Sequence, residues 1–388
     1  MMKSLNAIRG RNTRFAATAL VAAGLITASA AAGIASAAAA GQPSATAATA
    51  AAQTPWSKVG TGWTLAMYTS SANRAGPTTL YLVSPAGSKY AVHTWQHGTN
   101  WNLVAMSPAG NAALFQNTSV MTGKTRAYLM NLKSGATSSF RLPQSSLLIG
   151  YGPGGTSVLV GARASIYRYS LTGARLASLT HAAFGDIDYS VTASAIVMPG
   201  SKDIVIADND GLLVVRPSGK LVRYLPVGGT NGACTPVRLK TGGVILAYCV
   251  PDQASSGPQV HGVPVNGNHP WVITAVRDFN GADYGDTDAW SLGGKTFVQG
   301  EPGCGPEFLG LQHKNGTVTP LSMPGDASGS VVDASTGDEM MITRAGCEGF
   351  SILMRFDPLT GQSRMVFNGK HGAGAYAVVA DNRNGTQP

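Results

Sequence analysis

Seven segments of the chain repeat one pattern, in which a short β-rich run is followed by a tight turn containing glycine and then by a second β-rich run. The turn glycines lie 38 to 49 residues apart. They are Gly87, Gly135, Gly173, Gly219, Gly267, Gly316 and Gly361. Repetition with this period constrains the fold more than any other feature, because each repeat must be one supersecondary unit that buries its apolar surface against its neighbours.

The intervals between these glycines hold a second set of hairpins, again with tight turns. Examples are residues 103–115, 147–160, 195–207, 236–248 and 331–342. Two hairpins per repeat make a four-stranded sheet, and seven repeats of about 40–50 residues predict an all-β fold, a seven-bladed β-propeller. The competing architecture is a pair of β-sandwiches, but sandwiches do not require seven evenly spaced repeats.

The two ends of the repeated region are complementary. The first repeat has a strand at residues 62–68 with no clear strand before it, and a spare strand lies at residues 375–385. We expect this C-terminal strand to close the first blade. Closure would leave only short, protected edges, which is how propellers avoid edge-to-edge aggregation.

The N-terminal region predicts export. A basic segment ends at Arg14, an apolar run follows, and Ala35-Ser36-Ala37 supplies an A-x-A cleavage site. We therefore expect a signal peptide at residues 1–37, a low-complexity linker at 38–54, and the propeller domain at 55–388, secreted to the extracellular medium. An uncleaved membrane anchor is the alternative, although the run is rich in Ala and Gly and is only weakly hydrophobic.

The charge of the mature chain argues against nucleic acid as a partner. The formal net charge is +9, but four basic residues lie in the leader, and their removal leaves 24 basic against 19 acidic residues. Binding to nucleic acid needs a clustered basic face rather than a mild, dispersed excess. We expect a monomer that does not insert into a membrane after the signal peptide is removed.

Three of the turns have sequences that resemble a turn found in a known family. The turns at 83–87, 106–110 and 151–155 read VSPAG, MSPAG and YGPGG. They are similar to the S-P-D-G turn of WD40-like repeats in the TolB-like propellers of exported bacterial proteins, although the aspartate is missing. The resemblance implies a binding or scaffold module, since most members have such roles and some are enzymes.

Four cysteines in an exported protein predict two disulfides. Cys234 and Cys249 flank the hairpin that turns at Thr241-Gly242, and counting outward from that turn, with 239 opposite 244, places them directly opposite each other. Cys304 and Cys347 occupy equivalent loops of consecutive repeats, so we pair them with each other. Thiol chemistry or a zinc site is the alternative, but no C-x-x-C and no Cys/His cluster at zinc spacing occurs.

Acidic residues gather in the loops at one end of the last four predicted blades. In a propeller, the loops that connect successive blades lie on the same face as the loops between the second and third strands. Eleven of the nineteen acids fall in these loops of blades 4 to 7. They are Asp208, Asp210, Asp252, Asp278, Asp283, Asp286, Asp288, Glu301, Glu307, Asp326 and Glu348. Turns prefer polar residues generally, but this preference does not explain sorting by sign.

Asp286 and Asp288 form the densest part of this acidic sector. We expect them to share one face of a strand, since they are two residues apart. Crowded carboxylates either bind a cation or have a raised pKa suited to acid–base chemistry. We therefore predict a ligand site at Asp286, Asp288, Asp283, Glu301 and Glu348. A divalent cation on Asp286 and Asp288 is the one cofactor that these residues suggest. Hydrogen bonding by Asp at strand ends is the alternative explanation.

These features favour a non-enzymatic binding or scaffold protein whose ligand or protein partner contacts the acidic loops. One alternative is an extracellular, cation-assisted hydrolase or lyase that uses Asp286, Asp288 or Glu301. Another is adhesion to anionic cell-wall polymers through the basic turns on the opposite face. The sequence has no nucleophile elbow, H-E-x-x-H motif or phosphate loop to support a particular chemistry.

Overall fold

A computed structural model describes most of the chain beyond the N-terminal region. The chain divides into two units, residues 1–36 and 37–388, and every described residue belongs to the second. The described residues are 54–69, 76–97, 99–119, 122–163, 165–180, 194–240, 242–251, 257–275, 285–300, 308–322, 328–336, 339–345, 351–369 and 374–379. The predicted signal peptide lies outside these ranges.

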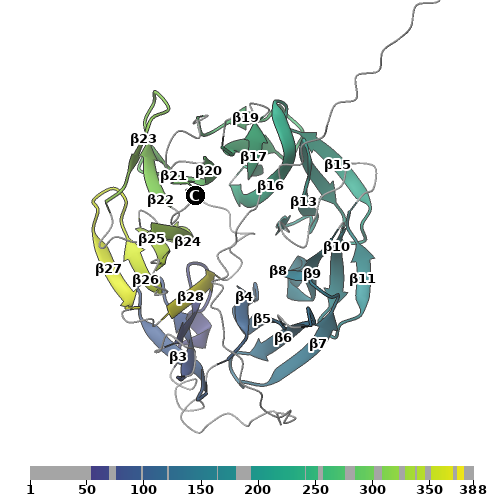
Figure 1. The fold of residues 1–388 in the computed structure, drawn as a ribbon, viewed down its shortest axis with the longest axis vertical. Helices are drawn as coiled ribbons and strands as arrows, with labels where there is room; N and C mark the ends of the chain where they lie inside the picture. The colour runs from purple at the N-terminus through teal and green to yellow at the C-terminus, as the bar shows by residue number, and fades with distance from the viewer. Residues whose placement is uncertain are drawn as a thin grey trace, which may run out of the picture. The chain divides into compact units, whose positions relative to one another are not determined.

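The described strands form six antiparallel sheets, five with four strands and one with eight (Figure 1). The first sheet consists of β28 (Gly374–Val379), β1 (Thr64–Thr69), β2 (Thr78–Val83) and β3 (Lys89–Trp95). The second consists of β4 (Asn102–Met106), β5 (Ala112–Thr118), β6 (Thr125–Asn131) and β7 (Thr137–Leu142). The third consists of β8 (Leu147–Tyr151), β9 (Ser157–Ala162), β10 (Ser165–Ser170) and β11 (Arg175–Ser178).

The eight-stranded sheet and the last two four-stranded sheets follow along the chain. The eight strands are β12 (Ala195–Val197), β13 (Ile204–Asn209), β14 (Gly211–Val215), β15 (Leu221–Pro226), β16 (Thr230–Lys240), β17 (Val244–Pro251), β18 (Gln259–Pro264) and β19 (Trp271–Val272). The next sheet is β20 (Asp286–Leu292), β21 (Lys295–Gly300), β22 (Phe308–Gln312) and β23 (Val318–Pro320). The last is β24 (Ser328–Thr336), β25 (Glu339–Ala345), β26 (Ser351–Phe356) and β27 (Ser363–Phe367). The two described helices are short 3-10 turns, η1 (Trp56–Lys58) and η2 (Pro153–Gly155).

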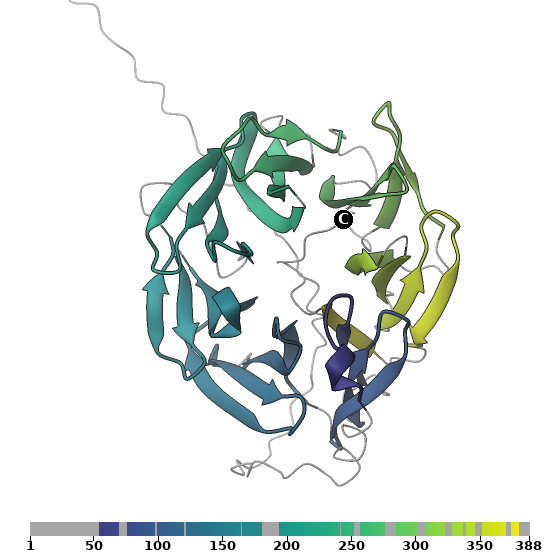
Figure 2. The ribbon, with the colours of Figure 1, turned by 180° about the vertical axis from the view of Figure 1, so that it is seen from behind.

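The sheets follow one another around a ring, which is the arrangement of a propeller. Strands such as β4, β8, β16, β20 and β28 lie toward its centre, whereas β7, β11, β15 and β27 lie at its rim (Figure 1, and Figure 2 from behind). The all-β propeller arrangement predicted from the repeats is therefore confirmed. The predicted division into seven separate blades is not, because two sets of four strands are joined in one sheet.

The turn glycines occupy the backbone conformation that the repeat pattern requires. All seven have φ between +70° and +91°. In this left-handed region a side chain would be strained, whereas glycine pays no steric penalty. Gly219 shows a second reason, because a Cβ at this position would lie 2.1 Å from the carbonyl oxygen of Ser178. The glycine pattern thus marks hairpin turns, and the turn at Gly219 also abuts the neighbouring sheet.

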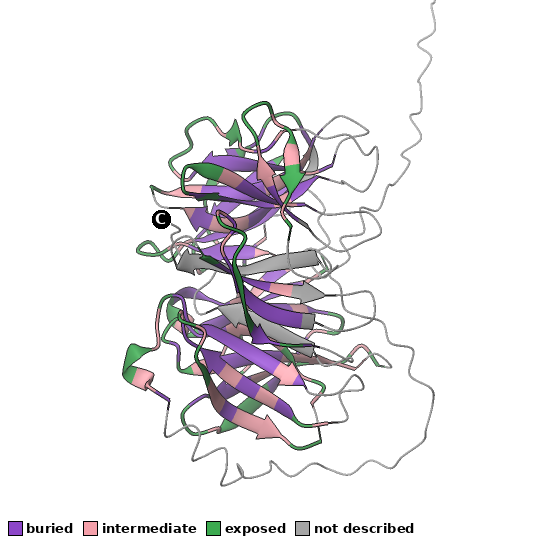
Figure 3. Cartoon of the chain, turned by 90° about the vertical axis from the view of Figure 1, so that its left-hand side faces the viewer, coloured by how far each residue is buried: buried purple, intermediate pink, exposed green. Residues whose placement is uncertain are grey.

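The core lies between neighbouring sheets, where apolar side chains from two sheets interdigitate. In one such cluster, Ile204 and Ile206 of β13 pack with Leu159 of β9 and Ile166 of β10. Five clusters between other neighbouring sheets are built in the same way, and one more lies between the two halves of the eight-stranded sheet. Figure 3 shows the resulting pattern, with buried residues in the sheets and exposed residues mostly in the turns and on outer strands. Burial of apolar side chains on both sheet faces is the main stabilising contribution.

The C-terminal strand completes the first sheet, as the sequence predicted. All six residues of β28 pair with β1, from Thr64 opposite Val379 to Thr69 opposite Gly374. The other edge of β1 pairs with β2. Both ends of the chain therefore contribute to one sheet, and β1 has no free edge.

The eight-stranded sheet results from an edge of β13 that two strands share. Residues Ile204–Ile206 of β13 pair with β12, while Asp208 and Asn209 pair with Cys234 and Ala233 of β16. The opposite edge of β13 pairs with β14. Main-chain hydrogen bonding therefore runs from one set of four strands into the next at this place.

Candidate functional site

Of the residues predicted to form a ligand site, the structure describes Asp286 and Asp288. Both lie on β20 and both are buried. Asp283, Glu301 and Glu348 lie outside the described residues, as do Cys304 and Cys347. The approach of Asp283, Glu301 and Glu348 to Asp286 and Asp288 stays a prediction, and so does the disulfide between Cys304 and Cys347.

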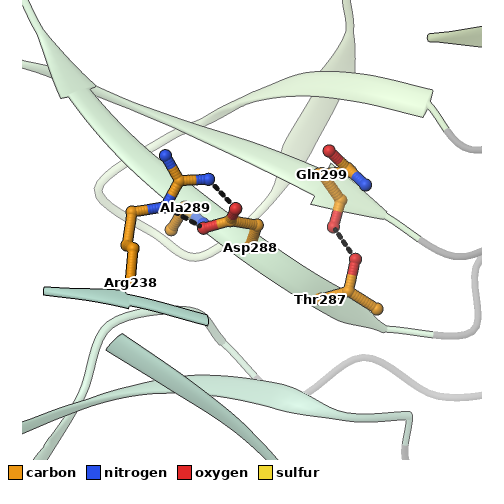
Figure 4. A network of polar contacts seen from close by, with 5 residues as sticks. All are labelled: Arg238, Thr287, Asp288, Ala289 and Gln299. Atoms are coloured by element: carbon orange, nitrogen blue, oxygen red, sulfur yellow. Dashed lines mark hydrogen bonds and ion pairs between the residues drawn. The ribbon is translucent and has the colours of Figure 1, made fainter. Parts of the chain in front are cut away.

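Asp288 is engaged by an arginine from the neighbouring innermost strand (Figure 4). The Nε atom of Arg238, on β16, donates to Oδ1 of Asp288 at 2.9 Å, and its Nη2 atom pairs with Oδ2. The guanidinium also lies 4.4 Å from the ring centroid of Trp290. The two side chains are only 13% and 9% exposed. This bidentate pair links β16 to β20, so the charge of Asp288 is compensated within the protein.

A β-bulge corrects the expectation that Asp286 and Asp288 share one strand face. Asp286 lies opposite Gly300, whereas Asp288 lies opposite the adjacent residue, Gln299. Thr287 between them donates its hydroxyl to the carbonyl of Gln299. The extra residue interrupts the two-residue alternation on which that expectation depends.

A second acidic pair lies at the end of β13 and is more promising as a site. Asp208 is only 3% exposed, and its Oδ2 atom has no hydrogen-bond partner among the residues that the structure describes. Asp210 follows in the turn between β13 and β14 with φ of +59°, a conformation that aspartate tolerates better than most residues. Burial raises the pKa of Asp208 to about 6, a hydrogen bond from the Asn209 backbone opposes this rise, and the charge of Asp210 adds to it.

Tyr224 on β15 covers this acidic pair. Its hydroxyl donates to the carbonyl of Asp210 at 3.2 Å. A Cβ at Gly211 would lie 3.0 Å from the ring, so the glycine permits the tyrosine to pack closely over the turn. Burial raises the pKa of Tyr224, and the charges of Asp208 and Asp210 raise it further. The phenol therefore stays neutral and can donate a hydrogen bond beside two carboxylates.

The predicted disulfide between Cys234 and Cys249 is confirmed, and it lies next to this acidic end. The two residues are paired across β16 and β17, with Cα atoms 4.3 Å apart. Cys234 is also the residue that lies opposite Asp208 on β13. The cross-link therefore fixes the strand that borders Asp208.

Removing this disulfide should destabilise the fold measurably. It closes a loop with a sequence separation of 15, and a loop of this size contributes about 3 kcal/mol in the chain-entropy model. For Cys234→Ala/Cys249→Ala we expect the melting temperature to fall by roughly 4 °C. Calorimetry of the variant and of the wild type measures this difference. A peptide map showing Cys249 joined to Cys304 would contradict the pairing.

The described residues include neither a preformed metal centre nor a membrane-spanning helix. Within them, no group of three or more His, Cys, Asp or Glu side chains is arranged to hold a metal ion. In the same ranges no helix has the length and apolar character needed to cross a bilayer. A cation bound at this end would therefore need ligands in addition to Asp208 and Asp210.

Comparison with known proteins identifies the fold and no closer relationship. No family model matches the sequence, and neither does any curated protein. The β-propeller domain of the trilobed protease from Pyrococcus furiosus aligns with a TM-score of 0.50 and 12% identity, over 81% of this chain and 95% of that one. A prolyl endopeptidase aligns with a TM-score of 0.52 and 11% identity, over 86% of this chain and 54% of that one.

The chain is a β-propeller. TolB from Acinetobacter baumannii also matches, with a TM-score of 0.42 and 12% identity over 82% of this chain and 84% of that one. The propeller spans about half the length of the prolyl endopeptidase that it matches. The Pyrococcus domain is described as having an open velcro topology, whereas here β28 pairs with β1.

Two features of this propeller were missed by reasoning from sequence. Arg238 lies 50 residues before Asp288, and only the ring brings them together. Asp208 was predicted among the eleven acids of this sector but not as part of the ligand site, although within the described residues it is buried, its Oδ2 atom has no hydrogen-bond partner and its pKa is raised to about 6. A signal was present in the apolar run IVIA that precedes Asp208, because a carboxylate at the end of a buried strand loses water contact.

Proposed function

We propose that this protein is an exported binding propeller whose ligand presents a cationic group, or a divalent cation, to Asp208 and Asp210. The observation that carries the proposal is the buried Oδ2 atom of Asp208, for which the described part of the chain offers no hydrogen-bond partner. A buried carboxylate without a partner costs free energy that a bound cation would recover. The nearby disulfide supports the proposal because a rigid site loses little entropy on binding.

We also propose that the ring consists of seven blades. Seven apolar clusters of described residues support it, one for each pair of neighbouring four-strand sets. The eight-stranded sheet then counts as two blades, since only Asp208 and Asn209 of β13 pair with β16.

Export is supported by the cross-link between Cys234 and Cys249, because disulfides persist in oxidising compartments and are rare in the cytosol. The cleavable leader at residues 1–37 and the extracellular location stay predictions.

The cation site is tested by thermal melting with calcium, magnesium or spermidine against a chelator-treated control. A ligand that binds only the folded state adds about 2.7 kcal/mol to the free energy of unfolding when its concentration is one hundred times its dissociation constant. The melting temperature rises as a result. We expect at least one of these cations to raise the melting of the wild type by several degrees. Asp208→Asn and Asp210→Asn should remove that rise.

The same experiment has an internal control and a pH signature. Asp203→Asn changes a carboxylate just before the start of β13, away from Asp208, so it should keep the response to cations. Protonation of Asp208 below a pKa of about 6 removes the charge, so the response should be present at pH 7.5 and should weaken about ten-fold in affinity by pH 5. An unchanged response in Asp208→Asn would refute the site.

A hydrolase or lyase is the second candidate, and the same aspartate favours it. A carboxyl group with a pKa near 6 can donate and accept protons close to neutral pH. Under this alternative Asp208→Asn would abolish turnover while leaving ligand binding in place. Under the binding proposal the substitution removes binding. The wider acidic site with Asp283, Asp286, Asp288, Glu301 and Glu348, and adhesion through the basic turns, also stay predictions.

A further inference from the structure

A pocket of about 420 Å³ opens at the end of the strands away from Asp208, between the β12–β13 turn with β14 and β15 on one side and the end of β16 with the β16–β17 turn on the other. Asp203, which directly precedes β13, lines the pocket, whereas Asp208 lies near the other end of the same strand. Apolar side chains make up much of its lining, including Val214, Val222, Leu239 and Val265. A volume of this size lies within the range of small-molecule sites.

Two cationic side chains, Arg223 and Lys240, line the pocket together with these apolar residues. Nη1 of Arg223 donates to the carbonyl of Val265 at 3.3 Å, and a Cβ at Gly267 would lie 3.0 Å from the same nitrogen. The guanidinium is therefore held across the β18–β19 turn. Neither cation takes part in an ion pair in the part of the chain that the structure describes. Both are available to an anion from solution.

We propose that this pocket binds a small amphipathic anion, with one carboxylate on a short aliphatic body. The two cations and the single carboxylate of Asp203 give the lining a net charge of +1, which suits a singly charged head better than a polyanion. The aliphatic body would lie on Val214 and Leu239, which are buried, and on Val222, which is 45% exposed. The pocket lies at the other end of β13 from Asp208, and the proposal does not rest on the cationic-ligand site there.

The proposed site predicts how binding affinity depends on the chain length and the charge of the ligand. Each methylene group that enters the pocket strengthens binding about four-fold if it is fully buried. Titration calorimetry with acetate, hexanoate and octanoate should therefore show affinity rising in that order. Octanamide, which has the same body without the charge, should bind about ten-fold more weakly than octanoate.

Variants separate the pocket from nonspecific binding. Arg223→Gln and Lys240→Gln should each lower the affinity for octanoate by about ten-fold. Val222→Glu, at an exposed position that tolerates a polar residue, should weaken octanoate more than octanamide, because both probes lose the apolar contact but only octanoate is repelled by the new carboxylate. Lys220→Gln is the matched control, since Lys220 lies in the neighbouring β14–β15 turn but does not line the pocket. Melting curves confirm that each variant is folded.

Two results would overturn the proposal. One is affinity for octanoate that does not exceed that for acetate. The other is octanoate binding by the folded Arg223→Gln/Lys240→Gln variant at wild-type affinity. Because the probes carry no cationic group, neither result bears on the site at Asp208, which the cation series tests.

Discussion

Deletion of residues 374–388 is expected to abolish cooperative folding. The deletion removes β28, so all six residues of β1 lose their main-chain partners on one edge. β1 is mostly buried, and a buried strand cannot replace these hydrogen bonds with water. We expect a loss comparable with the whole stability of a domain, about 5–15 kcal/mol, together with aggregation through the open edge. Circular dichroism and sedimentation of the truncated protein measure both effects.

A shorter deletion provides the control for this experiment. Removing only residues 380–388 leaves β28 complete, and the variant should melt as the full chain does. If the longer deletion also melted normally, the pairing of β1 with β28 would not be needed for the ring to close.

Replacement of Arg238 by alanine should have the second-largest effect. Asp288 would keep its buried position but lose the guanidinium that neutralises it, and one face of Trp290 would lose its cationic neighbour. Breaking a buried ion pair from one side typically costs about 3–5 kcal/mol, because the remaining charge is left without compensation. Denaturant titration of Arg238→Ala measures this loss.

Two further variants distinguish the ion pair from simple packing. Arg238→Met/Asp288→Leu removes both charges and keeps the volume, so it should be much closer to wild type than Arg238→Ala. Arg126→Ala changes an exposed arginine on β6, and its effect should stay within about 0.5 kcal/mol. Equal stability of Arg238→Ala and wild type would show that the pair contributes nothing.

The parts of this fold that were predictable from sequence are those that local chemistry determines. The turn glycines were found because a left-handed turn excludes most other residues, and Gly135 and Gly316 both adopt that conformation. Closure by β28 followed from counting strands. The joining of two blades through Asp208 and Cys234 was not predictable, because a two-residue overlap between strands leaves no mark on hydrophobic periodicity.

The disulfide shows how a correct prediction can rest on an incorrect register. Counting outward from the turn placed residue 239 opposite 244, whereas Leu239 lies opposite Ile245. A β-bulge between Pro236 and Arg238 then shifts the pairing by one residue, so Cys234 meets Cys249 after all. Proline cannot donate a hydrogen bond to the ladder and is common at such bulges. The contacts of Asp288 are harder still to predict from sequence, since its partner Arg238 comes from a different sheet.

The shared edge of β13 has a consequence for how this part of the protein opens. Sheets that touch only through side chains can unfold locally one at a time, but β12–β15 and β16–β19 also share main-chain hydrogen bonds. Exchange of amide protons in the two sets should therefore be governed by one common opening event. Asp208 and the pocket beside Asp203 both belong to this cooperative unit. A ligand at either end would then suppress the same fluctuation, so each would tighten the binding of the other without any change in average structure.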